Sequence, residues 1–280
     1  MLAALIIVFR EVLEAGLIVG VMLAATEGVA GRGRVIALGI GGGVLGSCLV
    51  ALFAERIATL FDGSGQDVLN AAILAIAVVM LVWTVVWMAS HGKEMVLEMK
   101  TVGREVREGS KPLAAVGIVV GMAVLREGVE VVLFMYGIAI SGESALNVAL
   151  GFALGVLAGA AVSFALYRGL VAIPVKLLFK TTTILITLLA AGLAAQSVGI
   201  LQDTGFIQSL SDPLWDSSWL LSDDGAVGRV LRTMVGYRAQ PTGMQIIAYV
   251  GTVIVIVALS QIVNGRIAKA KQRNVSAKPA

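Results

Sequence analysis

Two short charged motifs interrupt the most apolar parts of this 280-residue sequence. Both read Arg-Glu-x-x-Glu, from Arg10 to Glu14 and from Arg126 to Glu130. Because residues three and four apart share one face of a helix, each arginine can reach the last glutamate of its motif. Each motif then keeps a formal charge of −1, which leaves carboxylate oxygen for another partner. Such hard oxygen ligands suit Fe³⁺, Fe²⁺, Mg²⁺, Ca²⁺ and Mn²⁺ and disfavour Cu⁺.

Two other interpretations of the motifs are open. They could be salt bridges that only clamp helices together, or the glutamates could relay protons. A charged side chain at mid-membrane depth costs roughly 2.5–3.5 kcal/mol, so six amount to about 15 kcal/mol before pairing. Helix packing does not need such a cost twice. We therefore expect a cation site with four ligands and two orienting arginines, namely Glu11, Glu14, Glu127 and Glu130, with Arg10 and Arg126.

The sequence around the motifs is that of a membrane protein. Apolar residues make up 58% and charged residues 14%, whereas a soluble domain has about half and about a quarter. Runs of about twenty apolar residues can cross a hydrocarbon core about 30 Å thick. They predict an all-α polytopic membrane protein with seven transmembrane helices, at about 2–25, 35–54, 68–90, 113–140, 145–167, 181–201 and 243–263. The single cysteine, Cys48, excludes an internal disulfide and is expected to be a buried core residue.

Basic residues give the expected orientation. Fifteen of the 21 lie in the connections 26–34, 91–112 and 168–180 and in the tail, 264–280, whereas the alternate connections hold four. The positive-inside rule then places the C-terminus in the cytoplasm and the N-terminus outside. It also explains the net charge of +3 without nucleic acid as a partner. We expect 91–112 to extend the third span as a charged helix, and 202–242 to be an external loop with short interfacial pieces.

The two halves of the chain resemble each other. The second charged motif follows the first by 116 positions, and the glycine-rich segment 149–157 matches 37–45 at six of nine positions, 112 residues apart. We therefore predict one permease domain, 1–263, built of an inverted 3+3 repeat, about 1–90 and about 113–201. Span seven, 243–263, is an extra helix followed by a basic cytoplasmic tail. Transporters commonly have this architecture, with the substrate site at the repeat interface.

A further candidate site lies at the inner end of the third span. His91, Glu94 and Glu98 fall on one helix face and are expected to form a metal exit site. The alternative is that His91 is an interfacial residue with a structural role.

The paired motifs resemble the signature of the oxidase-dependent iron permeases, which include fungal high-affinity permeases and the bacterial permease of the elemental ferrous iron uptake system. Three further patches are similar: residues 83–88, residues 190–195, and Gly236-Tyr237 with Pro241. One departure is Val12, at a motif position where the family commonly has glycine, as Gly128 does. Val12 should not ligate metal, so this departure concerns helix packing.

The resemblance implies an iron permease of the bacterial cytoplasmic (inner) membrane, and no enzyme. It would import Fe²⁺ or Fe³⁺, with iron as substrate, membrane lipid around it and no permanently bound cofactor. Its implied partners are a periplasmic iron-binding protein and a haem peroxidase. Two alternatives remain: a permease for another divalent metal, of the lead or manganese type, and a non-transporting membrane subunit whose Arg-Glu motifs are structural clamps.

Overall fold

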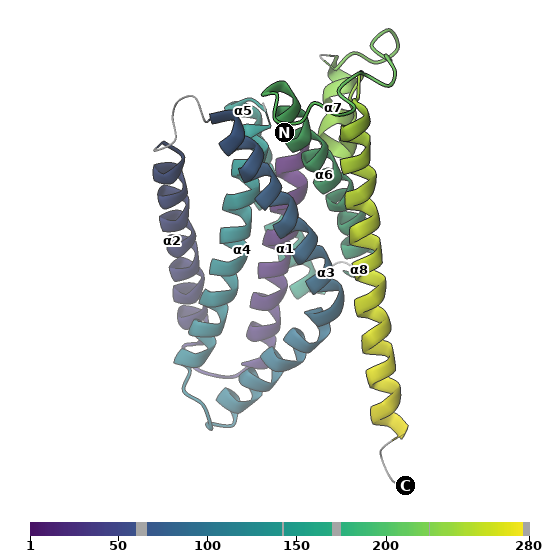
Figure 1. Cartoon of the computed structure of the whole chain (residues 1–280). Coiled ribbons are helices and arrows are strands. Elements are labelled where there is room, and N and C mark those ends of the chain that lie inside the picture. Colours follow the sequence, from purple (N-terminus) through teal and green to yellow (C-terminus); the bar gives the residue numbers. More distant parts are fainter. Residues whose placement is uncertain (60–65, 142, 170–174, 224, 277–280) are drawn as a thin grey trace. The chain divides into compact units, whose positions relative to one another are not determined.

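The structure is a computed structural model that describes residues 1–59, 66–141, 143–169, 175–223 and 225–276. The regular elements in these ranges are helices, as predicted (Figure 1). Their bounds are α1 (Leu2–Ala25), α2 (Arg32–Thr59), α3 (Gln66–Arg107), α4 (Ala114–Ile140), α5 (Ala145–Tyr167), α6 (Val175–Asp203), α7 (Ala226–Val235) and α8 (Gly243–Ser276).

Among the described residues, five helical segments are long and apolar enough to cross a membrane: Arg32–Phe53, Asp67–Trp87, Ala145–Tyr167, Lys180–Asp203 and Gly243–Val263. The chain is thus a multi-pass membrane protein. Helices α1 and α4 have 24 and 27 residues, which is also enough to span a bilayer, but each contains a charged motif. Helix α5 has the predicted bounds, whereas α8 continues past the predicted end of span seven into the tail.

The chain divides into two compact units. The first comprises Met1–Ile73 and Glu94–Thr182, and the second comprises Leu74–Lys93 and Thr183–Ala280. Both charged motifs lie in the first unit.

Two helix pairs build the first unit (Figure 1): α1 lies along α5, and α4 lies along α2. Glycines let the backbones of each pair meet. A Cβ added to Gly155 of α5 would lie 2.8 Å from the Cβ of Val8, and one added to Gly43 of α2 would lie 2.7 Å from the Cβ of Val124. Gly155 follows Gly43 by 112 positions, and Val124 follows Val8 by 116. These are the same offsets that separate the two charged motifs (116) and the two glycine-rich segments (112) in the sequence.

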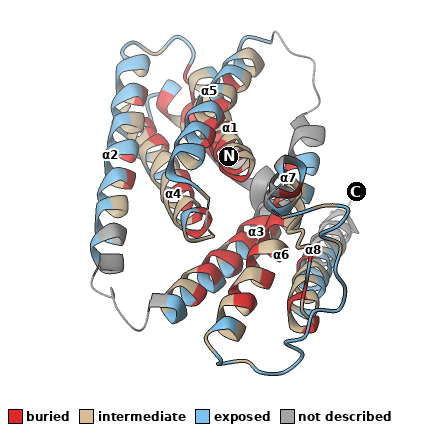
Figure 2. Ribbon diagram, turned by 90° about the horizontal axis from the view of Figure 1, so that it is seen from above, coloured by how far each residue is buried: buried red, intermediate tan, exposed pale blue. Residues whose placement is uncertain are grey.

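The remaining faces of α2 and α5 are apolar and exposed, as the pale blue residues of Figure 2 show. Leu38, Leu45 and Phe53 of α2 are among them, and so is Cys48. The expectation of a buried cysteine was therefore wrong. An apolar run in a membrane helix does not distinguish the packed face from the lipid-facing one, and among the described residues α2 packs mainly along α4.

The end of α3 is an amphipathic helix, as its alternating sequence predicted. Its apolar side joins a buried cluster in which Met99 and Val106 pack with Ile18 and Met22 of α1 and with Val116 of α4. This packing fixes the end of α3 against the end of α1.

In the second unit, the connection from α6 to α8 is a folded structure that contains α7. It is anchored to α6 where Gly192 and Gly236 meet, because a Cβ on either glycine would overlap with the backbone of the other. Gly236 has a φ of 71°, which favours glycine. Asp216 accepts hydrogen bonds from Ser218 and Gln240, which lower the pKa of its carboxyl. This aspartate therefore organises the loop.

Candidate metal centre

The first motif is buried in the middle of α1. Arg10 donates a hydrogen bond from Nε to Oε1 of Glu14 over 2.7 Å, and its Nη1 lies 3.6 Å from Oε1 of Glu11. All three side chains are almost fully buried. The pairing of Arg10 with Glu14 at i and i+4 agrees with the prediction from spacing. Glu11 has the weaker contact, because 3.6 Å is too long for a hydrogen bond.

The second motif repeats this pairing on α4 in a more open setting. Nε of Arg126 donates to Oε1 of Glu130 over 3.2 Å and lies 4.0 Å from Oε1 of Glu127. The glutamates are buried, but the Arg126 side chain is 35% exposed, against 2% for Arg10. The two motifs therefore share a sequence and a pairing but differ in how far the rest of the chain covers the arginine.

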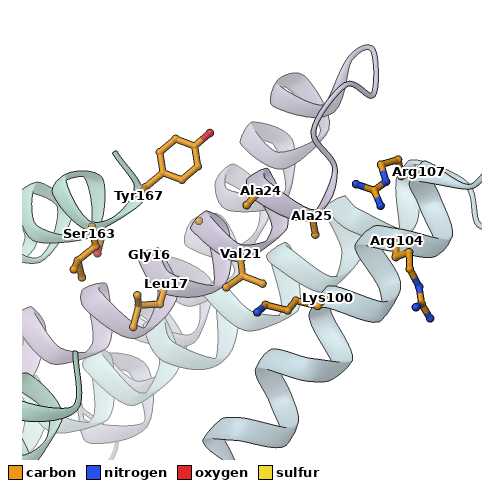
Figure 3. Close-up of a pocket in the computed structure, with 12 residues that line it drawn as sticks. Gly16, Leu17, Val21, Ala24, Ala25, Lys100, Arg104, Arg107, Ser163 and Tyr167 are labelled. Carbon is orange, nitrogen blue, oxygen red and sulfur yellow. The ribbon is translucent and has the colours of Figure 1, made fainter. Parts of the chain in front are cut away.

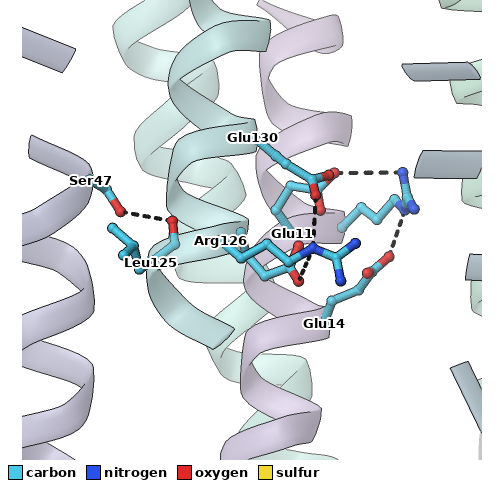
Figure 4. A network of polar contacts seen from close by, with 8 residues as sticks. Glu11, Glu14, Ser47, Leu125, Arg126 and Glu130 are labelled. Atoms are coloured by element: carbon cyan, nitrogen blue, oxygen red, sulfur yellow. Dashed lines mark hydrogen bonds and ion pairs between the residues drawn. The ribbon is translucent and has the colours of Figure 1, made fainter. Parts of the chain in front are cut away.

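Carboxylates from both helices converge. Glu11 and Glu14 of α1 and Glu127 of α4 each offer an oxygen within 4.8 Å of the others. Oxygens that bind one hard cation lie about 2.0–2.6 Å from it, so two of them are at most about 5 Å apart. The three oxygens therefore satisfy the spacing for a shared ion. Glu130 lies beside this group, paired with Arg126, and points to the same interface (Figure 4).

The cluster has unsatisfied hydrogen-bonding capacity. Three buried carboxylate oxygens have no hydrogen-bond partner within the described part of the chain. They are both oxygens of Glu11 and Oε2 of Glu127. Nη1 of Arg10 also lacks such a partner. An unmet buried acceptor costs free energy, the more so when it is charged. A cation between α1 and α4 would satisfy these oxygens.

Ser47 of α2 and Gly159 of α5 pack against the two motifs. Sequence reasoning did not assign this role to either residue. On α2, Oγ of Ser47 donates to the carbonyl of Gly43 over 2.9 Å and lies 3.4 Å from the carbonyl of Leu125, next to Arg126 (Figure 4). A Cβ on Gly128 would overlap with this serine. On α5 the equivalent position is Gly159, and a Cβ there would lie 2.9 Å from Cβ of Val12.

These contacts explain the departure at Val12. Where α1 carries valine in the motif, α5 carries glycine; where α4 carries Gly128, α2 carries serine. One partner of each pair is small, so the two helix backbones can approach closely at both motifs. The sequence contains the information needed to find these pairs. Gly128 follows Val12 by 116 positions and Gly159 follows Ser47 by 112, but the match can be recognised only once α1 is known to pair with α5.

The predicted exit site remains a prediction. The side chains of residues 91 and 94 lie outside the described residues, and Glu98 is exposed.

Comparison with known proteins places the chain in a sequence family. The sequence model of the Iron permease FTR1 family matches residues 1–271, and the chain belongs to this family. It is 28% identical to the ferrous iron permease EfeU of Escherichia coli O6:H1 over 249 residues, covering 86% of this chain and 88% of that protein. It is 29% identical to the ferrous iron permease EfeU of Yersinia pestis over 254 residues, 89% of each chain. No solved structure matches.

Proposed function

We propose that this protein imports iron across the inner membrane of a bacterium through the carboxylates of α1 and α4. Glu11, Glu14 and Glu127 would be the first ligands, and Glu130 would join them when the metal displaces Arg126. The observation that carries this proposal is that three carboxylate oxygens from two helices lie within 4.8 Å of one another in a buried position. Membership of an iron permease family and relatives named as ferrous iron permeases support iron as the cargo.

The proposed topology is seven spans in an inverted repeat, with the N-terminus outside. Helices α1 and α4 would join the five apolar segments as spans. The equivalent contacts at Gly43 and Gly155 support the repeat. In each pair the contacts advance together along both helices, so α1 is parallel to α5 and α4 to α2. A two-fold axis in the membrane plane would then pass between the motifs, as in other transporters with inverted repeats.

The arginines would regulate the charge of the site. In the absence of metal, Arg10 holds Glu14 and Arg126 holds Glu130, which partly neutralises four carboxylates in a medium where charge is costly. A cation entering between the helices would compete with the arginines for the same oxygens. Binding would therefore be reversible, which transport requires. A periplasmic iron-binding protein and a haem peroxidase are the partners we propose for delivery and for the iron's oxidation state.

The test is Glu11→Gln, which keeps the shape of the side chain and removes its charge. We expect at least a tenfold loss of Fe²⁺ affinity, measured by calorimetry on purified protein, and a parallel loss of iron uptake into proteoliposomes. Glu27→Gln is the matched control, because Glu27 is exposed just beyond the end of α1. Wild-type protein that binds no iron would favour a structural clamp. Tighter binding and faster uptake of Mn²⁺ or Pb²⁺ would indicate a permease for another metal.

A further inference from the structure

A cavity of about 650 Å³ lies in the first unit between α1, α5 and the end of α3 (Figure 3). It begins at Gly16, two residues beyond the first motif, and follows α1 to Ala25. Leu17 and Val21 lie on the face of α1 that carries Glu14, because they follow it by three and seven positions. The cavity thus lies next to the carboxylate cluster, towards the end of α1, and none of the four motif glutamates lines it.

The walls of this cavity are apolar for most of their area. Small residues of α1, such as Gly20, make room, and Tyr167 closes one side. Ser163 of α5 also lines the cavity; its Oγ is buried against Gly16 and has no hydrogen-bond partner among the described residues. A cavity of this kind can hold an apolar chain.

The mouth of the cavity is basic. Lys100, Arg104 and Arg107 of α3 line it, on the side of the amphipathic helix away from the apolar cluster. Arg104 is 3.8 Å from Glu108, whereas Lys100 and Arg107 have no ion pair within the part of the chain that the structure describes. In Figure 3 Lys100 extends towards Leu17 and Val21. The mouth thus carries an excess of positive charge above apolar walls.

We propose that this cavity binds an anionic phospholipid, with an acyl chain against α1 and α5 and the phosphate at Lys100 and Arg107. The combination of apolar walls and a cationic mouth matches an amphipathic anion, whereas a small free anion would leave most of the cavity unfilled. In the proposed topology this end of the unit faces the cytoplasm, where the leaflet is rich in anionic lipid. The binding itself does not depend on metal transport, so either proposal can fail without the other.

The test is lipid binding to the purified, delipidated full chain, measured by native mass spectrometry. Phosphatidylglycerol is compared with phosphatidylcholine of the same acyl chains. A basic residue near an anionic lipid strengthens binding roughly fivefold, so Lys100→Gln with Arg107→Gln should weaken phosphatidylglycerol binding about 25-fold. The matched control is Arg34→Gln with Lys180→Gln, which removes the same charge from exposed residues that do not line the cavity.

A second variant tests the apolar part. A Cβ at position 20 would lie 3.8 Å from the Tyr167 ring, so Gly20→Leu fills the cavity without a backbone clash. It should reduce phosphatidylglycerol binding at least tenfold, with an unchanged size-exclusion profile. Equal binding of the two lipids, or equal loss in the control pair, would overturn the proposal. Tight binding of glycerol phosphate that is unaffected by Gly20→Leu would also overturn it, in favour of a small-anion site.

Discussion

The two motif arginines have the same sequence context but different environments. Arg10 is buried with Glu11 and Glu14, whereas Arg126 is 35% exposed beside its glutamates. Breaking a buried ion pair costs about 3–5 kcal/mol, and an exposed one contributes about 0–1 kcal/mol. The first motif should therefore be the more sensitive to change.

The corresponding prediction compares Arg10→Lys with Arg126→Lys. An ammonium group keeps the charge but cannot reproduce the planar contacts of a guanidinium with two carboxylates. Arg10→Lys should lower the melting temperature of the purified protein markedly. Arg126→Lys should leave the melting temperature nearly unchanged and strengthen metal binding instead, because a weaker pair with Glu130 competes less with the cation. Thermal unfolding and calorimetry on the same preparations measure both effects. Equal destabilisation by the two variants would contradict the asymmetry.

Sequence reasoning predicted the pairing within each motif, because i and i+4 neighbours follow from helix geometry alone. It did not predict the difference in exposure, since that depends on which distant helices cover each arginine. It also expected four carboxylates at one site. The structure groups oxygens of Glu11, Glu14 and Glu127, and Glu130 lies beside them with a hydrogen bond from Arg126. Whether these residues bind metal remains a prediction.

At the scale of helices, the complementary pairs Val12 with Gly159 and Gly128 with Ser47 can be exchanged. Gly128→Val should overlap with Ser47, and overpacking of this kind costs about 1–3 kcal/mol. Adding Ser47→Gly makes the α2–α4 crossing resemble the α1–α5 crossing. The double variant should therefore recover most of the lost stability, a coupling that a double-mutant cycle isolates.

Melting temperature measures this exchange, with a loss of roughly 3–10 °C expected for Gly128→Val. Ser47→Gly alone is the control, because it removes a hydrogen bond to Gly43 without adding bulk. If the double variant is less stable than Gly128→Val, the two crossings are not equivalent.

The order and approximate bounds of the long helices were predictable, since apolar runs and charged connections determine them. The pairing of α1 with α5 and of α2 with α4 was not, because hydropathy does not say which helices touch. For the same reason Cys48 was assigned to the core, although it lies on an exposed face of α2. The glycines marked close packing, but only the structure identified their partners.

For the whole molecule, the proposed orientation predicts which surfaces meet each side of the membrane. With Cys48 replaced by alanine, a cysteine placed at the exposed position Ser222 should react with an impermeant thiol reagent on intact cells. One placed at Ser110, also exposed, should react only after permeabilisation. The reverse pattern would overturn the orientation.

The pairing of α1 with helices of the other half bears on how the chain is made. When α1 leaves the ribosome, α4 and α5 lie roughly 100 residues behind it, which is about 5–20 s of synthesis. During that interval the first motif has no partner from another helix. The Arg10–Glu14 bond is local, so it can form as soon as α1 coils. Glu11 is then the one charged residue of the nascent helix without a close partner, so its charge remains unfavourable in the membrane until α4 and α5 are inserted.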